Sequence, residues 1–201
     1  MKIIVWNSQD KCVADYHKLI RGCDVLCLLD CGQWTVPMYA LQIQNGLFHW
    51  KDEHEGLSYD IFYCLEKMAF ICRDGLYSGE SVLYSIHSNI GSLVGIRLQD
   101  DFWLFAHHEP NLVNAYHIGE FYLREISDRF RKAAFIADFK KKSYSWVQET
   151  VGKLYCIALP EGYYPHTVNY LFTIHVACTD LYLLEGYSET SNQPTFFELD
   201  I

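Results

Sequence analysis

The sequence predicts one mixed α/β domain of the α+β kind, in which two packed β-sheets form a sandwich flanked by helices. Short apolar strands outnumber helices, and the two kinds of element alternate irregularly. Half of the 201 residues are apolar, and no linker or internal repeat divides them. A sheet must bury its apolar face against another layer, so this mixture favours sheet packed on sheet with helices outside. Residues 1–201 are therefore expected to form a single domain.

Ten segments are predicted to be strands because they are short, rich in β-branched or aromatic residues, and bounded by turn residues. Two pairs of them predict hairpins, because only a short polar turn separates Tyr59–Leu65 from Met68–Cys72 and Leu93–Leu98 from Phe102–Ala106. The predicted strands are Lys2–Trp6, Asp24–Leu29, Leu47–Trp50, Tyr59–Leu65, Met68–Cys72, Leu93–Leu98, Phe102–Ala106, Ala133–Ala137, Val168–Val176 and Pro194–Leu199.

Four segments are predicted to be helices. Asp10–Arg21 has apolar residues at helical spacing along one face. Thr35–Gln44 carries Pro37 in its first turn, a position where proline is favoured. The longest predicted helix is Asn111–Phe130, in which apolar residues again recur at helical spacing, and the last is Ser145–Val151.

The net charge and the hydropathy of the sequence disfavour two kinds of partner, nucleic acids and membranes. The formal net charge is −9, whereas contacts from Lys and Arg to phosphate supply most non-specific affinity for nucleic acid. A general nucleic-acid binder is therefore disfavoured, although a local basic patch is not excluded. No apolar stretch approaches the roughly 18 residues of a membrane helix, and the first residues show no signal-peptide pattern before their apolar run. We expect a cytoplasmic protein without a membrane partner.

The eight cysteines lie mostly inside apolar segments such as DVLCLLDC. Buried free thiols in a reducing compartment are the expected state, so we predict no disulfides. Cys23, Cys27 and Cys31 are spaced by four, which on a helix would suggest a metal-binding face. The segment is predicted to be a strand instead, on which Cys27 and Cys31 share a face and pack. It also lacks the tight CxxC pairing of zinc sites.

Polar residues follow four of the predicted strands at the point where each apolar run ends. IIVW is followed by Asn7, VLCLL by Asp30, FWLFA by His107 and His108, and AAFIA by Asp138. Taken singly, an Asn or Asp after a strand most often starts a turn or caps a helix. The ends of neighbouring strands project into one rim, so we expect these side chains to converge on one site.

The order and context of these segments resemble a known group of proteins. IIVWN, DVLCLLD, LVGIRLQDDFWLFAHH, AFIADF, NYLF and SNQP follow the motif order of the endonuclease/exonuclease/phosphatase superfamily. The pattern is most similar to that of the nuclease subunits of cytolethal distending toxins. Gly32 and Pro37 after the second segment, and Val94–Arg97 followed by Phe102–His107, carry much of this likeness. The resemblance spans almost the whole chain.

The resemblance implies a deoxyribonuclease-I-like sandwich that hydrolyses phosphoesters with a divalent cation, usually Mg²⁺. It implies a metal-binding role for Asn7 and for Asp30, which stands where the superfamily has the longer Glu. It further implies that His107 stabilises the transition state and that Asp138 orients the nucleophile. In such enzymes a His near the carboxyl terminus, oriented by an Asp, takes the proton of the attacking water.

Four positions depart from this pattern. Lys140 replaces the Asn two residues after Asp138, Asn169 replaces an Asp, and Asn192-Gln193 replace the final Asp-His pair. Gln cannot accept a proton at neutral pH, and Asn192 cannot stabilise an imidazolium. We therefore expect the general base to be missing, and Lys140 and Asn169 to contact phosphate. The positions expected to meet at one end of the sandwich are Asn7, Asp30, His107, Asp138, Asn169 and Gln193.

Three interpretations stay open at this point. In the first, the chain is a degenerate member of the superfamily that needs no cofactor and binds a phosphate-bearing ligand or a protein partner without hydrolysis. In the second, it is an active nuclease, phosphodiesterase or phosphatase. Asp30 and Asp138 then hold Mg²⁺, and His107, His108 or His166 supplies the base. In the third, the resemblance is coincidental. The first explains the loss of the base and of its orienting carboxylate together.

Overall fold

Strands make up nearly all of the regular structure in the described part of the chain. The computed structural model describes residues 1–8, 16–65, 68–85, 92–108, 130–139, 153–155, 168–184 and 193–201. In chain order the elements are β1 (Lys2–Asn7), α1 (Tyr16–Ile20), β2 (Val25–Leu29), β3 (Leu41–Gln44), β4 (Leu47–His54), β5 (Leu57–Cys64), β6 (Met68–Arg73), β7 (Tyr77–Ser85), β8 (Ser92–Leu98), the 3₁₀ turn η1 (Gln99–Asp101), β9 (Phe102–His108), β10 (Lys132–Phe139), β11 (Lys153–Tyr155), β12 (Val168–Ile174), β13 (Ala177–Leu183) and β14 (Thr195–Asp200).

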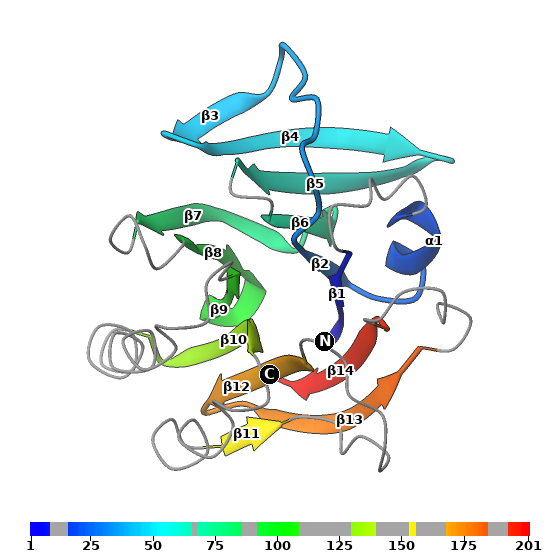
Figure 1. The fold of residues 1–201 in the computed structure, drawn as a ribbon, viewed down its shortest axis with the longest axis vertical. Coiled ribbons are helices and arrows are strands. Elements are labelled where there is room, and N and C mark those ends of the chain that lie inside the picture. The colour runs from blue at the N-terminus through cyan, green and yellow to red at the C-terminus, as the bar shows by residue number, and fades with distance from the viewer. Residues whose placement is uncertain are drawn as a thin grey trace.

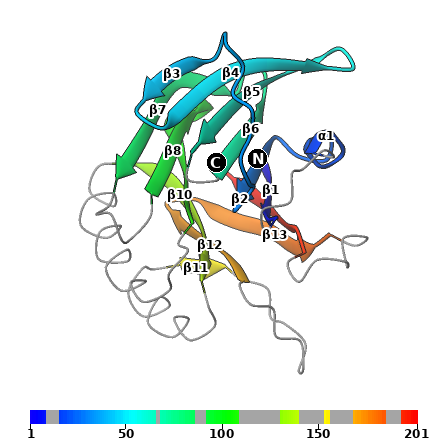
Figure 2. The ribbon, with the colours of Figure 1, turned by 45° about the horizontal axis from the view of Figure 1, so that its top comes forward.

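The strands form two mixed sheets that pack against each other (Figures 1 and 2). The first sheet has the order β13-β14-β1-β2-β6-β5-β4-β3, and the second has the order β11-β12-β10-β9-β8-β7. Each contains a parallel pair, β1 with β2 in the first and β9 with β10 in the second. Side chains from both sheets join in one core between them. The predicted sandwich of two mixed sheets is confirmed.

Side chains of the central strands alternate between two apolar clusters. Ile3 and Val5 of β1 face the second sheet, whereas Ile4 and Trp6 face the opposite side and pack with Leu19 of α1. Both faces of the central strands are therefore covered, and such strands appear in a sequence as continuous apolar runs. Burying one Ile or Leu side chain stabilises the fold by roughly 1.5–3 kcal/mol relative to leaving it exposed.

Both predicted hairpins are confirmed, and the structure adds four strands that the sequence does not predict. β5 pairs with β6 and β8 pairs with β9, each antiparallel. The four additional strands, β3, β7, β11 and β13, are the outermost strands of the two sheets. Their sequences, LQIQ, YSGESVLYS, KLY and ACTDLYL, contain polar residues along much of their length. Because an edge strand is less covered than a central one, it lacks the apolar run on which the strand prediction depends.

The predicted helix over Thr35–Gln44 is wrong. Residues 35–40 are irregular apart from a turn, and Leu41–Gln44 forms β3. Pairing of β3 with β4, and packing of Ile43 against the inter-sheet core, favour the extended conformation. Pro37 is compatible with either interpretation, since proline is common in turns as well as in the first turn of helices.

The other predicted helices are described only in part. Of Asp10–Arg21, the structure describes the second half, in which Tyr16–Ile20 is helical. Of Asn111–Phe130 it describes the last residue, and Ser145–Val151 lies outside the described residues. Among the described helices, none has the length and apolar character needed to cross a membrane.

Six cysteines lie in the described chain, and all six are free thiols. Cys27 belongs to the inter-sheet core, whereas Cys31 belongs to the cluster on the opposite face of the sheet. The prediction that these two share a face is therefore wrong. The reason is that β2 ends at Leu29, and Asp30, with a φ of 49°, turns the chain before Cys31.

A thiol titration of the denatured protein without reductant is expected to find close to eight free thiols, the full complement of the sequence. The native protein should react far more slowly, because burial raises the pKa of Cys23 to about 12 and that of Cys72 well above its usual value. The thiolate is the reactive form. Finding about half of the eight or fewer in freshly purified protein would contradict the prediction of no disulfides.

Candidate active site

Asn7 and Asp30 lie side by side at the carboxyl ends of two parallel strands. In the register of β1 with β2, Asn7 pairs with Leu29, and Asp30 follows directly. Asn7 is buried, with 4% of its surface exposed, and Asp30 is half-buried. An amide oxygen and a carboxylate are thus presented from adjacent strand ends. These are the ligand types that a hard divalent cation prefers.

The backbone around Asp30 is fixed by a short set of hydrogen bonds. The Ser8 N–H donates to the Leu29 carbonyl at 3.0 Å, and the Ser8 hydroxyl donates to the Asp30 carbonyl at 3.2 Å. Asp30 itself adopts a positive φ of 49°. Asp tolerates this left-handed conformation better than most residues. The turn is therefore built by the residue that also carries the carboxylate.

The loop after Asp30 is attached to the sheet through Tyr63 of β5. The Tyr63 hydroxyl donates to the Gly32 carbonyl at 3.2 Å and accepts from the Trp34 N–H at 3.1 Å. The Trp34 ring stacks on the Tyr63 ring with 5.7 Å between centroids and 8° between planes. The Trp34 indole N–H also donates to the Cys31 carbonyl at 3.2 Å. These contacts hold the loop in one conformation and thereby help to position Asp30.

Helix α1 packs against the same loop, the one that follows Asp30. Tyr16 stacks on Trp34 at 5.8 Å, and its hydroxyl donates to Asp52 of β4. The next residue, His17, stacks on His54 at the end of β4, with ring centroids 3.6 Å apart. Two imidazoles at this distance repel each other when both are protonated. The contact between α1 and β4 is therefore expected to depend on pH.

Acidification is expected to weaken the fold through His17. Burial, and then the nearby His54, lower the pKa of His17 below its usual value of 6.5. The unfolded chain therefore binds this proton at higher pH than the folded one. The contribution of His17 is fully present above pH 6.5 and is lost as the pH falls through the lowered pKa. Unfolding free energies at pH 8 and pH 5 should differ less in His17→Gln than in the wild type.

The same titration can be followed at the residue itself. His54→Phe should raise the pKa of His17, because it removes a neighbouring positive charge. Asp52→Asn should lower it, because it removes a favourable negative one. Proton NMR of the imidazole signals measures both shifts. A His17 pKa that stays unchanged in both variants would contradict the assignment of these neighbours as causes.

In the second sheet, three adjacent strands bring together the backbone positions of three predicted site residues. His107 of β9 pairs with Ala137 of β10, directly before Asp138. Asp138 in turn pairs with Asn169 of β12. His107 is fully buried. The order β12-β10-β9 thus aligns the backbone positions of Asn169, Asp138 and His107 across neighbouring strands.

The segment before the last strand returns to the Asn7 end of the first sheet. Gln193 is half-buried and stands two residues before Thr195, which pairs with Val5 in the antiparallel register of β14 with β1. Continuing this register towards Gln193 leads along β1 towards Asn7. The predicted site residues Asn192 and Lys140 lie outside the described residues, as does His166. His108 is the last residue of β9.

The structure therefore groups the predicted residues in two sets. Asn7, Asp30 and Gln193 belong to the end of the first sheet, and His107, Asp138 and Asn169 to three neighbouring strands of the second. β1 contacts β12 and β2 contacts β9 across the core, so the strands that carry the two sets face each other. The meeting of all six side chains in one site stays a prediction.

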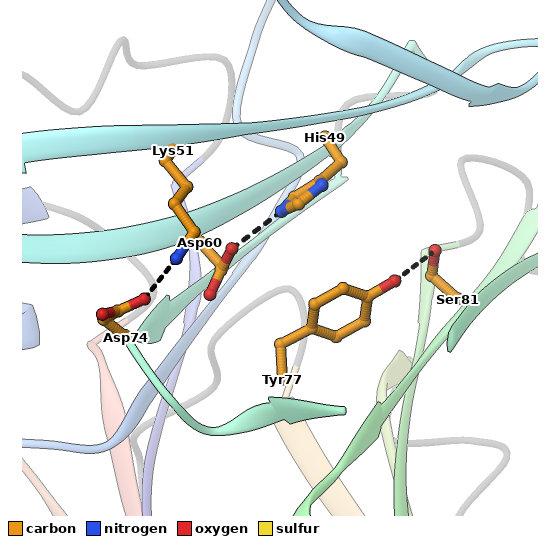
Figure 3. A network of polar contacts seen from close by, with 6 residues as sticks. All are labelled: His49, Lys51, Asp60, Asp74, Tyr77 and Ser81. Carbon is orange, nitrogen blue, oxygen red and sulfur yellow. Dashed lines mark hydrogen bonds and ion pairs between the residues drawn. The ribbon is translucent and has the colours of Figure 1, made fainter. Parts of the chain in front are cut away.

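A second polar cluster, which the sequence analysis does not identify, lies where β4 and β5 meet β7 (Figure 3). Asp60 of β5 is buried, and His49 of β4 bonds its carboxylate through Nε2 at 2.8 Å. The His49 ring stacks on Phe62 at 4.5 Å and contacts Tyr77 of β7 at 5.3 Å. Burial raises the pKa of Tyr77, whose hydroxyl lies 3.5 Å from that of Ser81. A carboxylate inside the apolar run YDIFYC is the one sequence signal for this cluster.

This cluster connects the two sheets, because His49 and Phe62 of the first sheet contact Tyr77 of the second. It is not part of the candidate site. Cys72 of β6 pairs with both Asp60 and Val25, so the cluster lies level with the beginning of β2, whereas Asp30 follows its end. Beside it, Lys51 of β4 forms an ion pair with Asp74 (Figure 3). Within the described chain, no three His, Cys, Asp or Glu side chains are grouped as a metal site would require.

Comparison with known proteins establishes the fold. No protein-family model matches the sequence, and no curated protein matches it. Solved structures match all of this chain: the cytolethal distending toxin of Haemophilus ducreyi (TM-score 0.65, 15% identity, 98% of that chain covered), a 3′ phosphatase, NExo, from Neisseria bound to product DNA hairpin (0.59, 11%, 100%), and a functionally unknown conserved protein from Enterococcus faecalis (0.58, 12%, 99%). The chain has a deoxyribonuclease-I-like fold, as its motifs predict.

Proposed function

We propose that this chain, a deoxyribonuclease-I-like domain, binds a phosphate-bearing ligand at the Asn7 end of its sandwich and does not hydrolyse it. The observation that carries the proposal is the position of Gln193. It stands two residues before Thr195, the first residue of β14 to pair with β1, where the resemblance expects a catalytic His. An amide neither takes a proton from water at neutral pH nor forms an imidazolium that a neighbouring carboxylate would stabilise.

The charges of the substituted residues support binding of an anion rather than a cation. Asn169 and Asn192 each replace a carboxylate, and Lys140 replaces an amide, so the site is three charges more positive than the pattern that it resembles. Asn169 pairs with Asp138 in the register of β10 with β12, so one of these changes is at the strand position opposite Asp138. A fixed ammonium holds a phosphate by charge alone and does not activate water.

Mg²⁺ fits this site only in part. Asn7 and Asp30 would hold it through oxygen, with the remaining ligands supplied by water and by the phosphate, as is usual for this cation. A bound Mg²⁺ offsets charge on phosphate oxygens as a bond to phosphorus breaks. Asp30 is one methylene shorter than the Glu of the pattern, so its carboxylate reaches less far from the strand end. The proposed binding therefore needs no cofactor.

A second candidate function is hydrolysis with altered machinery. The observation that favours it is the neighbouring pair Asn7 and Asp30, which retains the oxygen donors of a cation site. Asp138 and His107 also stand on adjacent strands. In this alternative the chain is a Mg²⁺-dependent phosphodiesterase, nuclease or phosphatase, with His107, His108 or His166 acting as the base. The missing Asp-His pair argues for binding instead.

The binding proposal is tested with a DNA hairpin that carries either a 3′-phosphate or a 3′-hydroxyl. The phosphorylated hairpin should bind more tightly, remain intact, and lose affinity as salt is added, because ionic contacts near the surface are screened. Lys140→Glu should weaken this binding at least about fivefold, which corresponds to about 1 kcal/mol for one ion pair.

Lys2→Glu makes the same charge change at the opposite end of β1 from Asn7 and serves as the control. Equal affinity for the two hairpins, or equal losses in the two Lys variants, would exclude recognition of a terminal phosphate at the proposed site. The protein-partner interpretation would then be preferred.

A further inference from the structure

One sheet edge of this protein differs from the other three. In the described chain the outermost strands are β13 and β3 in the first sheet and β11 and β7 in the second. β13 contains Asp180, β11 contains Lys153 and β7 contains Glu80, whereas β3, with the sequence LQIQ, contains no charged residue. Charged side chains on edge strands oppose pairing with another chain. β3 is the edge that lacks this protection.

The surroundings of β3 are also uncharged and unusually apolar. No Asp, Glu, Lys or Arg occurs between Cys31 and Trp50, although these residues make up 20% of the chain. Leu41 of β3 is 63% exposed, and Met38 and Tyr39, directly before it, are 104% and 71% exposed. These are the three most exposed large apolar side chains of the described residues. They lie together in one segment, and such patches mark interaction sites.

Contacts within the chain fix the conformation of β3. β3 pairs with β4, Ile43 packs against the inter-sheet core, and the Gln44 side chain accepts a hydrogen bond from the Leu83 N–H of β7. Figure 2 places β3 beside β7, and the two strands are in contact. Figure 1 shows β3 at the end of its sheet, beyond β4. A strand fixed in this way loses little conformational entropy when another strand pairs with it.

We propose that β3 pairs with β3 of a second copy of this chain, antiparallel about a two-fold axis, to join the two eight-stranded sheets in a dimer. The distribution of charge favours a second copy of the chain as the partner of β3. Each copy carries a net charge of −9, so two copies repel each other over most of their surfaces. The uncharged segment around β3 is a place where they can meet without opposing like charges. A two-fold contact also requires a self-complementary surface, which an uncharged strand provides.

The dimer contact is expected to be modest in size. β3 has four residues, and its Leu41 becomes buried against the partner together with Met38 and Tyr39, which directly precede the strand. Small interfaces of this kind associate reversibly. The weight-average mass measured by analytical ultracentrifugation should rise from that of one chain toward that of two as concentration increases through the micromolar range.

Two variants test the strand pair directly. Leu41→Lys should weaken dimerisation at least about tenfold, because it removes apolar contact and sets like charges against each other across the pair. Gln42→Lys, at another exposed position of β3, should do the same without removing an apolar side chain. Leu57→Lys is the matched control, since Leu57 is 52% exposed at the beginning of a different strand, β5. It should leave dimerisation unchanged within about twofold.

Hydrogen exchange provides a readout at the strand itself. The amides of Leu41–Gln44 should become more protected as the wild-type concentration rises, and should not do so in Leu41→Lys. A chain that stays monomeric up to millimolar concentration would overturn the proposal. A dimer that both β3 variants leave intact, or that Leu57→Lys weakens equally, would also overturn it, and so would β3 protection found only when a different protein is added.

Discussion

Restoring four side chains together is expected to create metal-dependent phosphoester hydrolysis in this protein. The changes are Lys140→Asn, Asn169→Asp, Asn192→Asp and Gln193→His. The restored His supplies a general base, which contributes on the order of 10²–10⁴ in rate. The two restored carboxylates orient that base and strengthen cation binding, and the cation offsets charge on the phosphoryl group. Hydrolysis of a phosphodiester with Mg²⁺ or Mn²⁺ should rise from background by at least about 100-fold.

Two controls separate this result from a contaminating enzyme. A variant with the first three changes but with Gln193 retained should stay near background, because it lacks the base. Adding Asp30→Ala to the four changes should remove the recovered activity, because Asp30 adjoins Asn7 at the proposed cation position. If the four-residue variant folds and yet remains at background, the strand ends do not hold the geometry that the fold resemblance implies.

Substitution of Gly95, a buried glycine, is expected to destabilise the fold strongly. Gly95 of β8 pairs with Phe105 of β9, and a Cβ added there would overlap the Phe105 ring and lie 3.1 Å from a methyl group of Val82. That ring cannot yield easily, since it is stacked between Phe135 at 4.8 Å and Trp103 at 5.6 Å. Overpacking of this kind costs about 1–3 kcal/mol.

Urea denaturation of Gly95→Ala should therefore show a loss of about 1–3 kcal/mol in the free energy of unfolding. Gly22→Ala is the matched control. Its added Cβ would meet only the Leu19 carbonyl at an ordinary 3.6 Å, so its effect should stay within about 0.5 kcal/mol. Equal effects of the two substitutions would contradict the packing of Phe105 over Gly95. The result bears on the site because β9 ends in the segment that carries His107.

The central strands can be predicted from the sequence, and the edge strands cannot. Val25–Leu29 is buried on both faces, so its five consecutive apolar residues predict a strand. The edge strand β13, ACTDLYL, is mostly exposed and shows no such pattern. At Thr35–Gln44, a proline and an apolar run are compatible with a helix, and only pairing with β4 decides for a strand. That pairing is a long-range property, which local sequence does not contain.

In the candidate site too, some features can be predicted from local sequence and others depend on contacts between strands. Asn7 and Asp30 are predictable because each ends an apolar strand, and the parallel pairing of β1 with β2 then brings them together. The Tyr63 hydroxyl that holds the loop after Asp30 is not predictable, because in the sequence it is one aromatic residue within the buried run YDIFYC. The pair Asp60 and His49 has the same origin, since it forms only when β4 and β5 align. The position of a residue at a strand end can therefore be predicted from the sequence, whereas side-chain contacts between strands cannot.

The most direct test of the proposed function is the turnover of the unmodified chain. Purified wild-type protein is incubated with plasmid DNA and with a simple phosphomonoester in Mg²⁺ or Mn²⁺, and product is measured against a metal-free control. Without the Asp-His pair at Asn192 and Gln193, both reactions are expected to stay at background. Clear metal-dependent turnover that Asp30→Ala or His107→Ala abolishes would contradict this account and would establish the enzyme with altered machinery in its place.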